Sequence, residues 1–359
     1  MRPTLCEINL NAVANNVRTL ISHVAPTPLC AVVKANGYGH GAVEVAKAAV
    51  EAGASWLAVA LVEEGVELRK AGLTAPILVL SEHHETSIDE LIENDLVATV
   101  YSEHGIDRLA QAATSQIEVH LGVDTGMRRV GVEPSDVEAR VAQINGHDTL
   151  RLGALWTHCP VADEPTNPFT TDQLARFDTA AVDGIATHVG NSAVAIDRPE
   201  RVGAMVRCGI SVYGIDPDDA LAGQMDLEPA MTIRSAVSFV KPIAAGEAVG
   251  YGHRWTASAP TTIATVPIGY ADGIRRDLGL RGGEALIGGR RFPIVGVVTM
   301  DQLMVDVGDQ DVAIDDEVII IGQQGNEQIL AADVARLLDT ISYEVICAIS
   351  ERVPRTYVR

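Results

Sequence analysis

The sequence predicts an α/β protein in which a (β/α)8, TIM-type barrel is followed by a mostly β C-terminal domain. Three observations predict this fold. Over the first two-thirds of the 359 residues, short β-rich runs alternate with helical segments. The alternation occurs eight times, which is the number of units in a closed barrel. After Pro229 it stops, and strand-like runs follow one another with glycine-containing turns between several of them.

The barrel prediction depends on the eight β-rich runs. Several are almost continuous apolar stretches, which is typical of strands covered on both faces. A doubly wound open sheet is the competing interpretation, and periodicity alone does not separate the two. The number of runs and their span of about 200 residues favour the barrel. The runs are Leu29–Val33, Trp56–Ala60, Ile77–Leu80, Val97–Tyr101, Ile117–Val123, Leu152–Thr157, Gly184–Val189 and Met205–Val212.

Helical segments are expected between these runs. Gly41–Ala52 and Val62–Lys70 are rich in Ala, Glu, Lys and Arg, and Gly53 and Gly72 are suitable residues to end them. Asn11–Val24 is expected to form another helix before the first barrel strand. The barrel is therefore assigned to residues 1–228, with the first residues, up to about residue 10, left free to pair with the second domain.

The second domain is expected to cover residues 229–359 and to be mostly β. The pair Gly288–Gly289, just before one of the runs, is a hairpin signal. One helix, Ala331–Leu338, interrupts the strands, and Asp339–Thr340 is expected to close it. The predicted strands are Thr232–Phe239, Thr262–Pro267, Phe292–Val298 and Glu317–Ile321.

Composition and charge exclude several classes of function. A net charge of -21 would repel a nucleic-acid backbone and an anionic membrane surface, so neither partner is expected. Five scattered cysteines without a CxxC pair indicate reduced thiols, and no metal is expected. His158 and Cys159 are adjacent on a predicted strand and should point to opposite faces, which argues against a catalytic pair. No signal peptide or long apolar run is seen, so a soluble cytoplasmic protein is expected.

Lys34 is the first candidate for chemistry. In such a barrel the active site is built at the carboxyl ends of the strands. Lys34 ends the first apolar run, in the segment AVVKANGYGHG (31–41). A lysine that only extends to solvent is the structural alternative. However, the glycines and Tyr38 beside it open the backbone and supply a hydroxyl group, and a desolvated lysine is what Schiff-base chemistry needs.

Polar residues also follow the later runs. The loop after the fifth run carries two arginines, of which Arg128 is suited to solvent and Arg129 to clamping a carboxylate or phenolic oxygen. His158 ends the sixth run, where a hydrogen-bonded structural histidine is an equal alternative to a catalytic one.

The loops after runs seven and eight form the usual phosphate site of these barrels. Asn191, Ser192, Gly209 and Ile210 are small or polar residues that fit this site, although tight turns alone would also use them. A phosphate site and a strand-end lysine in the same barrel mouth indicate a phosphorylated cofactor that condenses with an amine. The prediction is pyridoxal 5′-phosphate (PLP).

At this point the sequence resembles the alanine racemase family of fold-type III PLP enzymes, over essentially Pro3 to Arg359. One such motif would be weak evidence, but seven in the same order across both domains are strong evidence. They are AVVKANGYGHG (31–41), VDTGMRRVG (123–131), THVGNS (187–192), RCGISVYG (207–214), GYGHRWTA (250–257), IGYADG (268–273) and TMDQLMVD (299–306).

The resemblance implies roles for individual residues. Lys34 would be the Schiff-base lysine and one of two catalytic bases, and Tyr251 of the partner subunit would be the opposite base. Arg207 would face the pyridine nitrogen, with His158 beside it. Arg129 would lie near the phenolic oxygen and the substrate carboxylate. The phosphate contacts would be Tyr38, Ser192, Gly209, Ile210 and Tyr343, and the partner would also supply Met300 and Tyr270 on the substrate side. A homodimer with shared active sites is therefore implied.

One position departs from the family pattern. Many members have a carboxylated lysine seven positions before the clamp arginine, and here that position is Gly122. Glycine has no side chain to carry the anion. The expectation is either a replacement anion beside Arg129 or weaker binding of the substrate carboxylate.

The resemblance implies interconversion of L-alanine and D-alanine, with D-alanine supplied to peptidoglycan. A racemase of serine or another small amino acid is the nearest alternative, because a methyl-group difference gives only about 1–3 kcal/mol of discrimination. A PLP-dependent decarboxylase or aldolase on a related barrel is a second alternative, against which the motif around Tyr251 argues. A non-catalytic PLP carrier is a third, and such proteins generally lack a second domain.

Overall fold

The computed structural model describes residues 2–359 and divides into two compact units. The first unit consists of Asn11–Gly37 and Gly41–Glu228, and the second of the residues up to Leu10, Tyr38–His40 and Pro229–Arg359. The segment Tyr38–His40, which begins at the last residue of the turn after Lys34, thus belongs by its contacts to the second unit.

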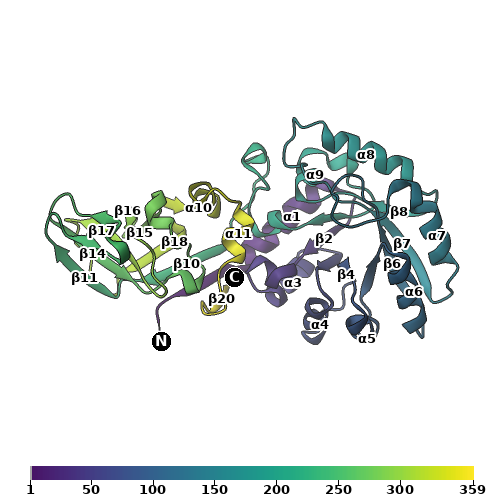
Figure 1. Ribbon diagram of the computed structural model, residues 1–359, viewed down its shortest axis with the longest axis horizontal. Helices are drawn as coiled ribbons and strands as arrows, with labels where there is room; N and C mark the ends of the chain where they lie inside the picture. The colour runs from purple at the N-terminus through teal and green to yellow at the C-terminus, as the bar shows by residue number, and fades with distance from the viewer. Residues whose placement is uncertain (1) are drawn as a thin grey trace. The chain divides into compact units, whose positions relative to one another are not determined.

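The first unit is a barrel of eight parallel strands (Figure 1). The first barrel strand, β2, pairs with both β3 and the last strand, β9, and this pairing is what distinguishes a barrel from an open doubly wound sheet. The predicted fold class is therefore confirmed. The strands are β2 (Leu29–Val32), β3 (Trp56–Val59), β4 (Ile77–Glu82), β5 (Val97–Val100), β6 (Ile117–Gly122), β7 (Leu150–Trp156), β8 (Ala186–His188) and β9 (Val206–Cys208).

Helices lie outside the strands and alternate with them along the chain (Figure 1). The helix over Val62–Lys70 has the expected bounds, with two glutamates in its first turn and a basic pair in its last, which complements the helix dipole. The helices are α1 (Leu10–Val24), the short α2 (Lys34–Tyr38), α3 (Ala42–Glu51), α4 (Val62–Lys70), α5 (Ile88–Glu93), α6 (Glu103–Ala112), α7 (Val137–Asn145), α8 (Phe169–Ala180) and α9 (Ser192–Asp197).

The eighth strand is shorter than the run Met205–Val212 predicts. It ends at Cys208, and Ile210–Tyr213 forms a 3₁₀ helix instead. Gly209 has φ -107° and ψ -91°, outside the strand region, and its N–H donates to Ser192 Oγ rather than to a neighbouring strand. The apolar run continues through this break because the 3₁₀ helix is also buried, so hydrophobicity alone could not locate the end of the strand.

The second unit is built around a ten-stranded, mostly antiparallel sheet (Figure 1). The N-terminal strand β1 pairs with β10 and β20, so these early residues pair with the β domain. The strands are β1 (Leu5–Asn9), β10 (Met231–Ala236), β11 (Phe239–Ile243), β14 (Thr261–Val266), β15 (Glu284–Ile287), β16 (Arg290–Val295), β17 (Leu303–Gly308), β18 (Glu317–Gln324), β19 (Glu327–Ile329) and β20 (Arg355–Val358), with β12 (Ala248–Val249) and β13 (Trp255–Thr256) as a separate pair.

Most turn signals of the β domain act as expected. Gly288 and Gly289 join β15 to β16 with positive φ at both residues, which a two-residue hairpin turn requires. Helix α10 (Ala331–Leu338) ends at Asp339, which has a left-handed conformation. The helix Ala331–Leu338 has the expected bounds, but the expectation of a single helix in this domain was wrong, because α11 (Ser342–Cys347) follows it. The predicted run Thr232–Phe239 is also divided between β10 and β11.

Candidate active site

Lys34 follows β2 and begins a left-handed turn. Ala35, Asn36, Gly37 and Tyr38 all have φ between 51° and 60°. Glycine and asparagine tolerate this region, whereas alanine and tyrosine adopt it at a cost. The Gly37 N–H donates to Val33 O over 2.9 Å and fastens the turn to the strand end. The lysine is therefore placed by an unusual backbone segment rather than by a regular helix.

Glu64, which the sequence analysis did not single out, holds this turn. Its carboxylate accepts hydrogen bonds from the backbone N–H of Ala35 at 2.6 Å, of Ala60 at 2.8 Å and of Leu61 at 3.1 Å. One side chain thus caps α4 and also anchors the residue after Lys34. The only sequence signal was an acidic residue in the first turn of a predicted helix, which is common in helices of any function.

Arg207 is a buried cation on β9, only 3% exposed. Its Nη1 donates to His188 Nδ1 at 2.6 Å, and its Nη2 donates to the Thr157 carbonyl at 2.9 Å. The guanidinium also lies 4.9 Å from the centroid of the Trp156 ring. Burial lowers the pKa of Arg207 from 12.5 to about 10, so it remains charged at neutral pH. Its orientation is fixed on several sides.

A chain of buried side chains continues behind Arg207. Arginine has no acceptor, so His188 Nδ1 must accept, and its Nε2–H donates to His120 Nδ1 at 2.9 Å. His120 Nε2 then lies 3.2 Å from Glu118 Oε1. The hydrogen bond from His120 lowers the pKa of Glu118, and burial holds the pKa of His188 well below 6.5. Both histidine tautomers are therefore fixed between a cation and a carboxylate.

His158 lies among the cations that the sequence assigned to the site. Burial, followed by the charges of Arg207, Arg129 and Lys34, lowers its pKa from 6.5 to about 3. Lys34 follows β2, Arg129 lies in the loop after β6 and Arg207 lies on β9, yet all three are close enough to act on one imidazole. The structure therefore brings together four predicted residues, and the histidine among them is neutral.

The predicted phosphate loops also lie together. Ser192, at the start of α9, accepts a hydrogen bond from the Gly209 N–H at 3.0 Å. Asn191 caps α9 by accepting from the Val194 N–H at 3.0 Å, and its Nδ2 lies 3.3 Å from the Cys159 carbonyl. Ile210 begins the 3₁₀ helix directly after Gly209. The loops after β8 and β9 are thus linked to each other and to the end of β7.

Gly122 lies beside the ring of Trp156, and Trp156 is two positions before His158 in the sequence. A Cβ added at Gly122 would be 3.5 Å from Trp156 Nε1. This indole nitrogen is buried and has no hydrogen-bond partner among residues 2–359. The exposed Arg129 likewise has no ion pair or hydrogen bond within the part of the chain that the structure describes. The expected replacement anion beside Arg129 stays a prediction.

In the β unit, Tyr38 and Tyr343 are brought together. Their ring centroids are 6.1 Å apart with an interplanar angle of 49°. Tyr343 is carried by α11, the helix that the sequence analysis missed. Gly39 follows Tyr38 with φ 81°, and a Cβ there would collide with the Ile346 carbonyl of the same helix. The glycine therefore allows the segment to approach α11 closely.

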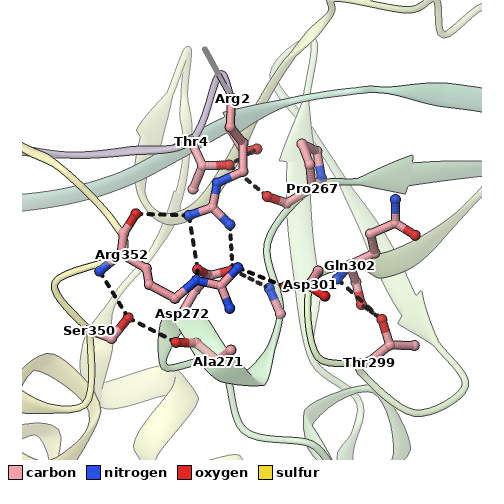
Figure 2. A network of polar contacts seen from close by, with 12 residues as sticks. Arg2, Thr4, Pro267, Ala271, Asp272, Thr299, Asp301, Gln302, Ser350 and Arg352 are labelled. Atoms are coloured by element: carbon pink, nitrogen blue, oxygen red, sulfur yellow. Dashed lines mark hydrogen bonds and ion pairs between the residues drawn. The ribbon is translucent and has the colours of Figure 1, made fainter.

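Three further predicted residues of the β unit are exposed. Tyr251 is 72% exposed, Met300 53% and Tyr270 41%. Tyr270 and Met300 lie in adjoining loops, because the N–H of Tyr270 donates to Thr299 O at 2.9 Å and that of Ala271 donates to Met300 O at 3.0 Å. Figure 2 shows the polar contacts around these loops. Their side chains are therefore accessible on the surface of the β unit.

Comparison with known proteins identifies the arrangement. Residues 8–217 match the family described as alanine racemase, N-terminal domain, and residues 230–357 match alanine racemase, C-terminal domain. The chain belongs to the alanine racemase family. The alanine racemase of Symbiobacterium thermophilum is 46% identical, over 99% of this chain and 97% of that protein. The alanine racemase of Halothermothrix orenii is 40% identical, over 99% and 97%.

Solved structures of alanine racemases agree. The structure of alanine racemase from E. faecalis matches with a TM-score of 0.95 and 40% identity, over 99% of this chain and 98% of that one. That of alanine racemase from Bacillus anthracis, with bound L-Ala-P, matches with a TM-score of 0.93 and 37% identity, over 100% and 96%. A histidine racemase from Leuconostoc mesenteroides also matches, with a TM-score of 0.92 and 29% identity, over 100% and 99%.

Membership of the alanine racemase family makes the chain an amino-acid racemase, an isomerase. The decarboxylase alternative is thereby disfavoured. Among residues 2–359, no group of three or more His, Cys, Asp or Glu side chains is arranged to hold a metal. Within the same residues, no helix combines the length and apolar character needed to cross a membrane.

Proposed function

We propose that this enzyme interconverts L-alanine and D-alanine with PLP, using Lys34 and Tyr251 of the partner subunit as two bases on opposite faces of the substrate. The observation that carries the proposal is the buried cation Arg207, which hydrogen bonds to His188 and Thr157 hold close to His158, together with Lys34 and Arg129. The names of the relatives support alanine as the substrate.

The residues present fit the cofactor. Lys34 supplies the amine that would hold PLP, and Arg207 supplies a fixed cation for its ring nitrogen. Asn191, Ser192, Gly209 and Ile210 would hold the phosphate, together with Tyr38 and Tyr343. When bound, PLP withdraws electrons from the substrate Cα and so weakens its C–H bond.

Arg207 has a defined task in this proposal. It can donate hydrogen bonds but cannot accept them, and with a pKa of about 10 it stays charged. A pyridine nitrogen facing it would accept a hydrogen bond and remain unprotonated. The electron withdrawal would then be moderate, which would restrain side reactions such as transamination. The bonds from Arg207 to His188 and Thr157 keep this cation in place.

Racemisation by two bases needs one proton-transferring group on each face of the substrate Cα. Lys34 at the end of β2 would exchange a proton on one face of Cα, and Tyr251 of the partner subunit would do so on the other. Neither base then has to move between faces. The 72% exposure of Tyr251 supports a role toward a second chain, so the proposal includes a homodimer. Arg129 would bind the substrate carboxylate, and Met300 and Tyr270 of the partner subunit would border the substrate.

The histidine racemase match favours one alternative, a racemase of another amino acid on the same scaffold. The decisive experiment measures kcat/KM in both directions for alanine and for serine on purified protein. It also records whether a visible absorbance band of bound PLP is present. Preference for alanine with a PLP band is the expected result. A colourless protein that stays inactive with added PLP would refute the proposal. A higher kcat/KM for serine would make serine, rather than alanine, the substrate.

The family resemblance extends the proposal to biology: the D-alanine would be used for peptidoglycan. A bacterial strain that needs added D-alanine should grow without it when this gene is expressed. Failure of a well-expressed, PLP-loaded enzyme to support growth would contradict that part of the proposal only.

A further inference from the structure

A fully buried carboxylate, Asp272, ends the 3₁₀ turn that carries Tyr270. Its side chain is 0% exposed. Arg2 binds it with two hydrogen bonds, from Nη1 to Oδ2 at 2.8 Å and from Nη2 to Oδ1 at 2.9 Å (Figure 2). The Arg352 Nε lies 3.4 Å from Oδ1. The Gly269 N–H also donates to Oδ2 at 2.9 Å, so both oxygens are occupied.

A buried charge of this kind needs compensation. Removing a carboxylate from water costs several kcal/mol unless partners replace the hydration. Here two arginines and a backbone N–H do so. The bidentate contact with Arg2 fixes the orientation of the carboxylate as well as its distance, because a planar guanidinium and a planar carboxylate form two parallel hydrogen bonds. Asp272 is thus held in a fixed orientation two residues from the exposed Tyr270.

The turn that contains Tyr270 and Asp272 is bonded to the neighbouring loop, which contains Met300. The 3₁₀ turn Tyr270–Asp272 bonds to Thr299 and Met300 through the N–H groups of Tyr270 and Ala271. A Cβ at Gly269 would collide with both the Thr299 and Met300 carbonyl oxygens, so only glycine permits this approach. The turn and the Met300 loop are therefore held together by backbone hydrogen bonds and close packing.

The C-terminal segment holds the same piece from the other side. The Ser350 N–H donates to Asp272 O at 3.1 Å, and Ser350 Oγ donates to Ala271 O at 2.9 Å. Arg352 also donates from Nη2 to Asp301 Oδ1 at 2.7 Å (Figure 2). Asp301 is the residue after Met300, and its side chain is largely exposed, so this pair contributes little by itself. The pair matters because the guanidinium of Arg352 contacts both the Tyr270 turn, through Asp272, and the Met300 loop, through Asp301.

We propose that Asp272, with Arg2 and Arg352 as counter-ions, is a positioning residue for Tyr270 and Met300. These two side chains are 41% and 53% exposed, so packing within their own chain does not fix them. Their placement comes from the backbone that Asp272 holds. The inference rests on the proposed function, in which both residues border the substrate bound by the partner subunit.

The first test is Asp272→Asn in the full-length, PLP-loaded enzyme. An amide keeps the shape but removes the charge that both arginines share. A shift of the loops by about an ångström should lower kcat/KM by roughly 10- to 100-fold. We expect most of this as a higher KM for alanine, with the PLP absorbance band unchanged. Unchanged kcat/KM and KM would overturn the proposal.

Asp333→Asn is the matched control. Asp333 also accepts from a backbone N–H, that of Leu330 at 2.8 Å, and pairs with an arginine, Arg336, at 3.0 Å. It belongs to α10 of the same unit and not to the Tyr270 turn. This variant should keep the wild-type KM. An equal rise in KM in both variants would mean a general loss of stability and would overturn the positioning role.

Mixed dimers provide the sharper test. Two differently tagged chains are co-expressed, and the dimer carrying both tags is purified. In the first arrangement one chain carries Lys34→Ala and the other Asp272→Asn. The only site with a lysine then receives its Tyr270 loop from the chain with an intact Asp272, and we expect the wild-type KM. In the second arrangement both changes are on one chain and the other is wild type. The working site then receives the altered loop, and we expect the raised KM.

A merely structural effect of Asp272→Asn would give the same KM in both arrangements. A role within its own chain would reverse the order of the two KM values. Either result overturns the proposal. Both arrangements contain the same two substitutions, so expression and cofactor loading are compared like for like.

Arg2 offers a second variant if Asp272→Asn fails to fold. Arg2→Ala leaves Arg352 to neutralise the carboxylate, so a smaller rise in KM is expected, and Arg2→Lys should recover part of it. Hydrogen exchange gives a readout that needs no racemase activity: the amides of Tyr270 and Ala271 should exchange faster in Arg2→Ala. If the wild type does not racemise alanine, the proposed function fails while this exchange result still decides the positioning role. Unchanged exchange and KM in Arg2→Ala would overturn it.

Discussion

His158 should make the barrel lose stability as the pH falls from 7 to 5. In the unfolded chain a histidine takes up a proton near pH 6.5, whereas burial and the charges of Arg207, Arg129 and Lys34 lower the pKa of His158 to about 3. Between these values the unfolded state binds more protons, so the free energy of unfolding decreases as the pH decreases. At pH 5, which is 1.5 units below 6.5, the loss from His158 is about 2 kcal/mol at about 1.4 kcal/mol per unit.

Other groups whose pKa values are shifted also contribute to the pH dependence of stability. Burial raises the pKa of Asp163 and of Asp216, and these two carboxyls oppose the loss from His158 as the pH falls. The pKa values of Glu118 and Asp107 are also lowered in the folded protein, but their effect begins only below the ordinary carboxyl values of 4.5 and 3.8. His188 and His83 have lowered pKa values and act in the same direction as His158. The wild-type loss is therefore not that of His158 alone, and a variant is needed to separate it.

The assay compares the wild type with His158→Asn by urea unfolding at pH 7 and pH 5. Tryptophan fluorescence reports mainly on the barrel, since Trp56 and Trp156 lie there. The decrease in the free energy of unfolding between pH 7 and pH 5 should be about 2 kcal/mol smaller in the variant. For a slope of about 2–3 kcal/mol per M, the corresponding difference in the shift of the urea midpoint is about 0.7–1 M. His84→Asn, at an exposed loop position, should keep the wild-type loss. Equal losses in wild type and His158→Asn would refute the reasoning.

Three other predictions concern the site. Tyr251→Phe should lower kcat at least about 100-fold in both directions while the PLP absorbance stays unchanged, as expected for loss of a proton-transferring group; retention of wild-type rates would exclude Tyr251 as a base. Glu118→Gln removes the charge at the end of the chain behind Arg207 and should lower the free energy of unfolding by about 1–2 kcal/mol in urea titrations; unchanged stability would mean that the carboxylate adds nothing to the chain. Finally, the KM for alanine should fall when chloride replaces a bulky anion at constant ionic strength, because Gly122 leaves Arg129 without a built-in anion, and a KM indifferent to chloride would contradict a replacement anion of this kind.

The fold was predictable where one local property decides it. Parallel barrel strands are buried on both faces, so apolar runs located all eight within a few residues. The end of the eighth strand at Cys208 was not predictable, because the following 3₁₀ helix is equally apolar. Helix α11 was missed because Ser342–Cys347 is short and directly follows another helix. Six residues give too little periodicity to be recognised.

The site was predictable where a residue type carries the chemistry, as with the strand-end lysine. It was not predictable where a side chain acts on another from far along the chain. Glu64 bonds to a residue 29 positions earlier, and Asp272 binds an arginine 270 positions earlier. In one sequence these carboxylates look like any helix-start or turn residue. His120 and Glu118 gave a weak signal, since alternate polar residues on an apolar strand share one face.

The turn after Lys34 shows why such distant partners matter. A left-handed conformation costs about 1–2 kcal/mol for a residue other than glycine, and Ala35, Asn36 and Tyr38 all adopt it. Asn36 offsets part of this cost itself, because its Oδ1 accepts from the Ala42 N–H at 3.0 Å. Ala35 has no such side chain, and its N–H is held instead by Glu64 at 2.6 Å. The glycines of the motif therefore explain only part of the turn. The position of the lysine at the end of β2 also depends on a carboxylate from the next helix-containing unit of the barrel.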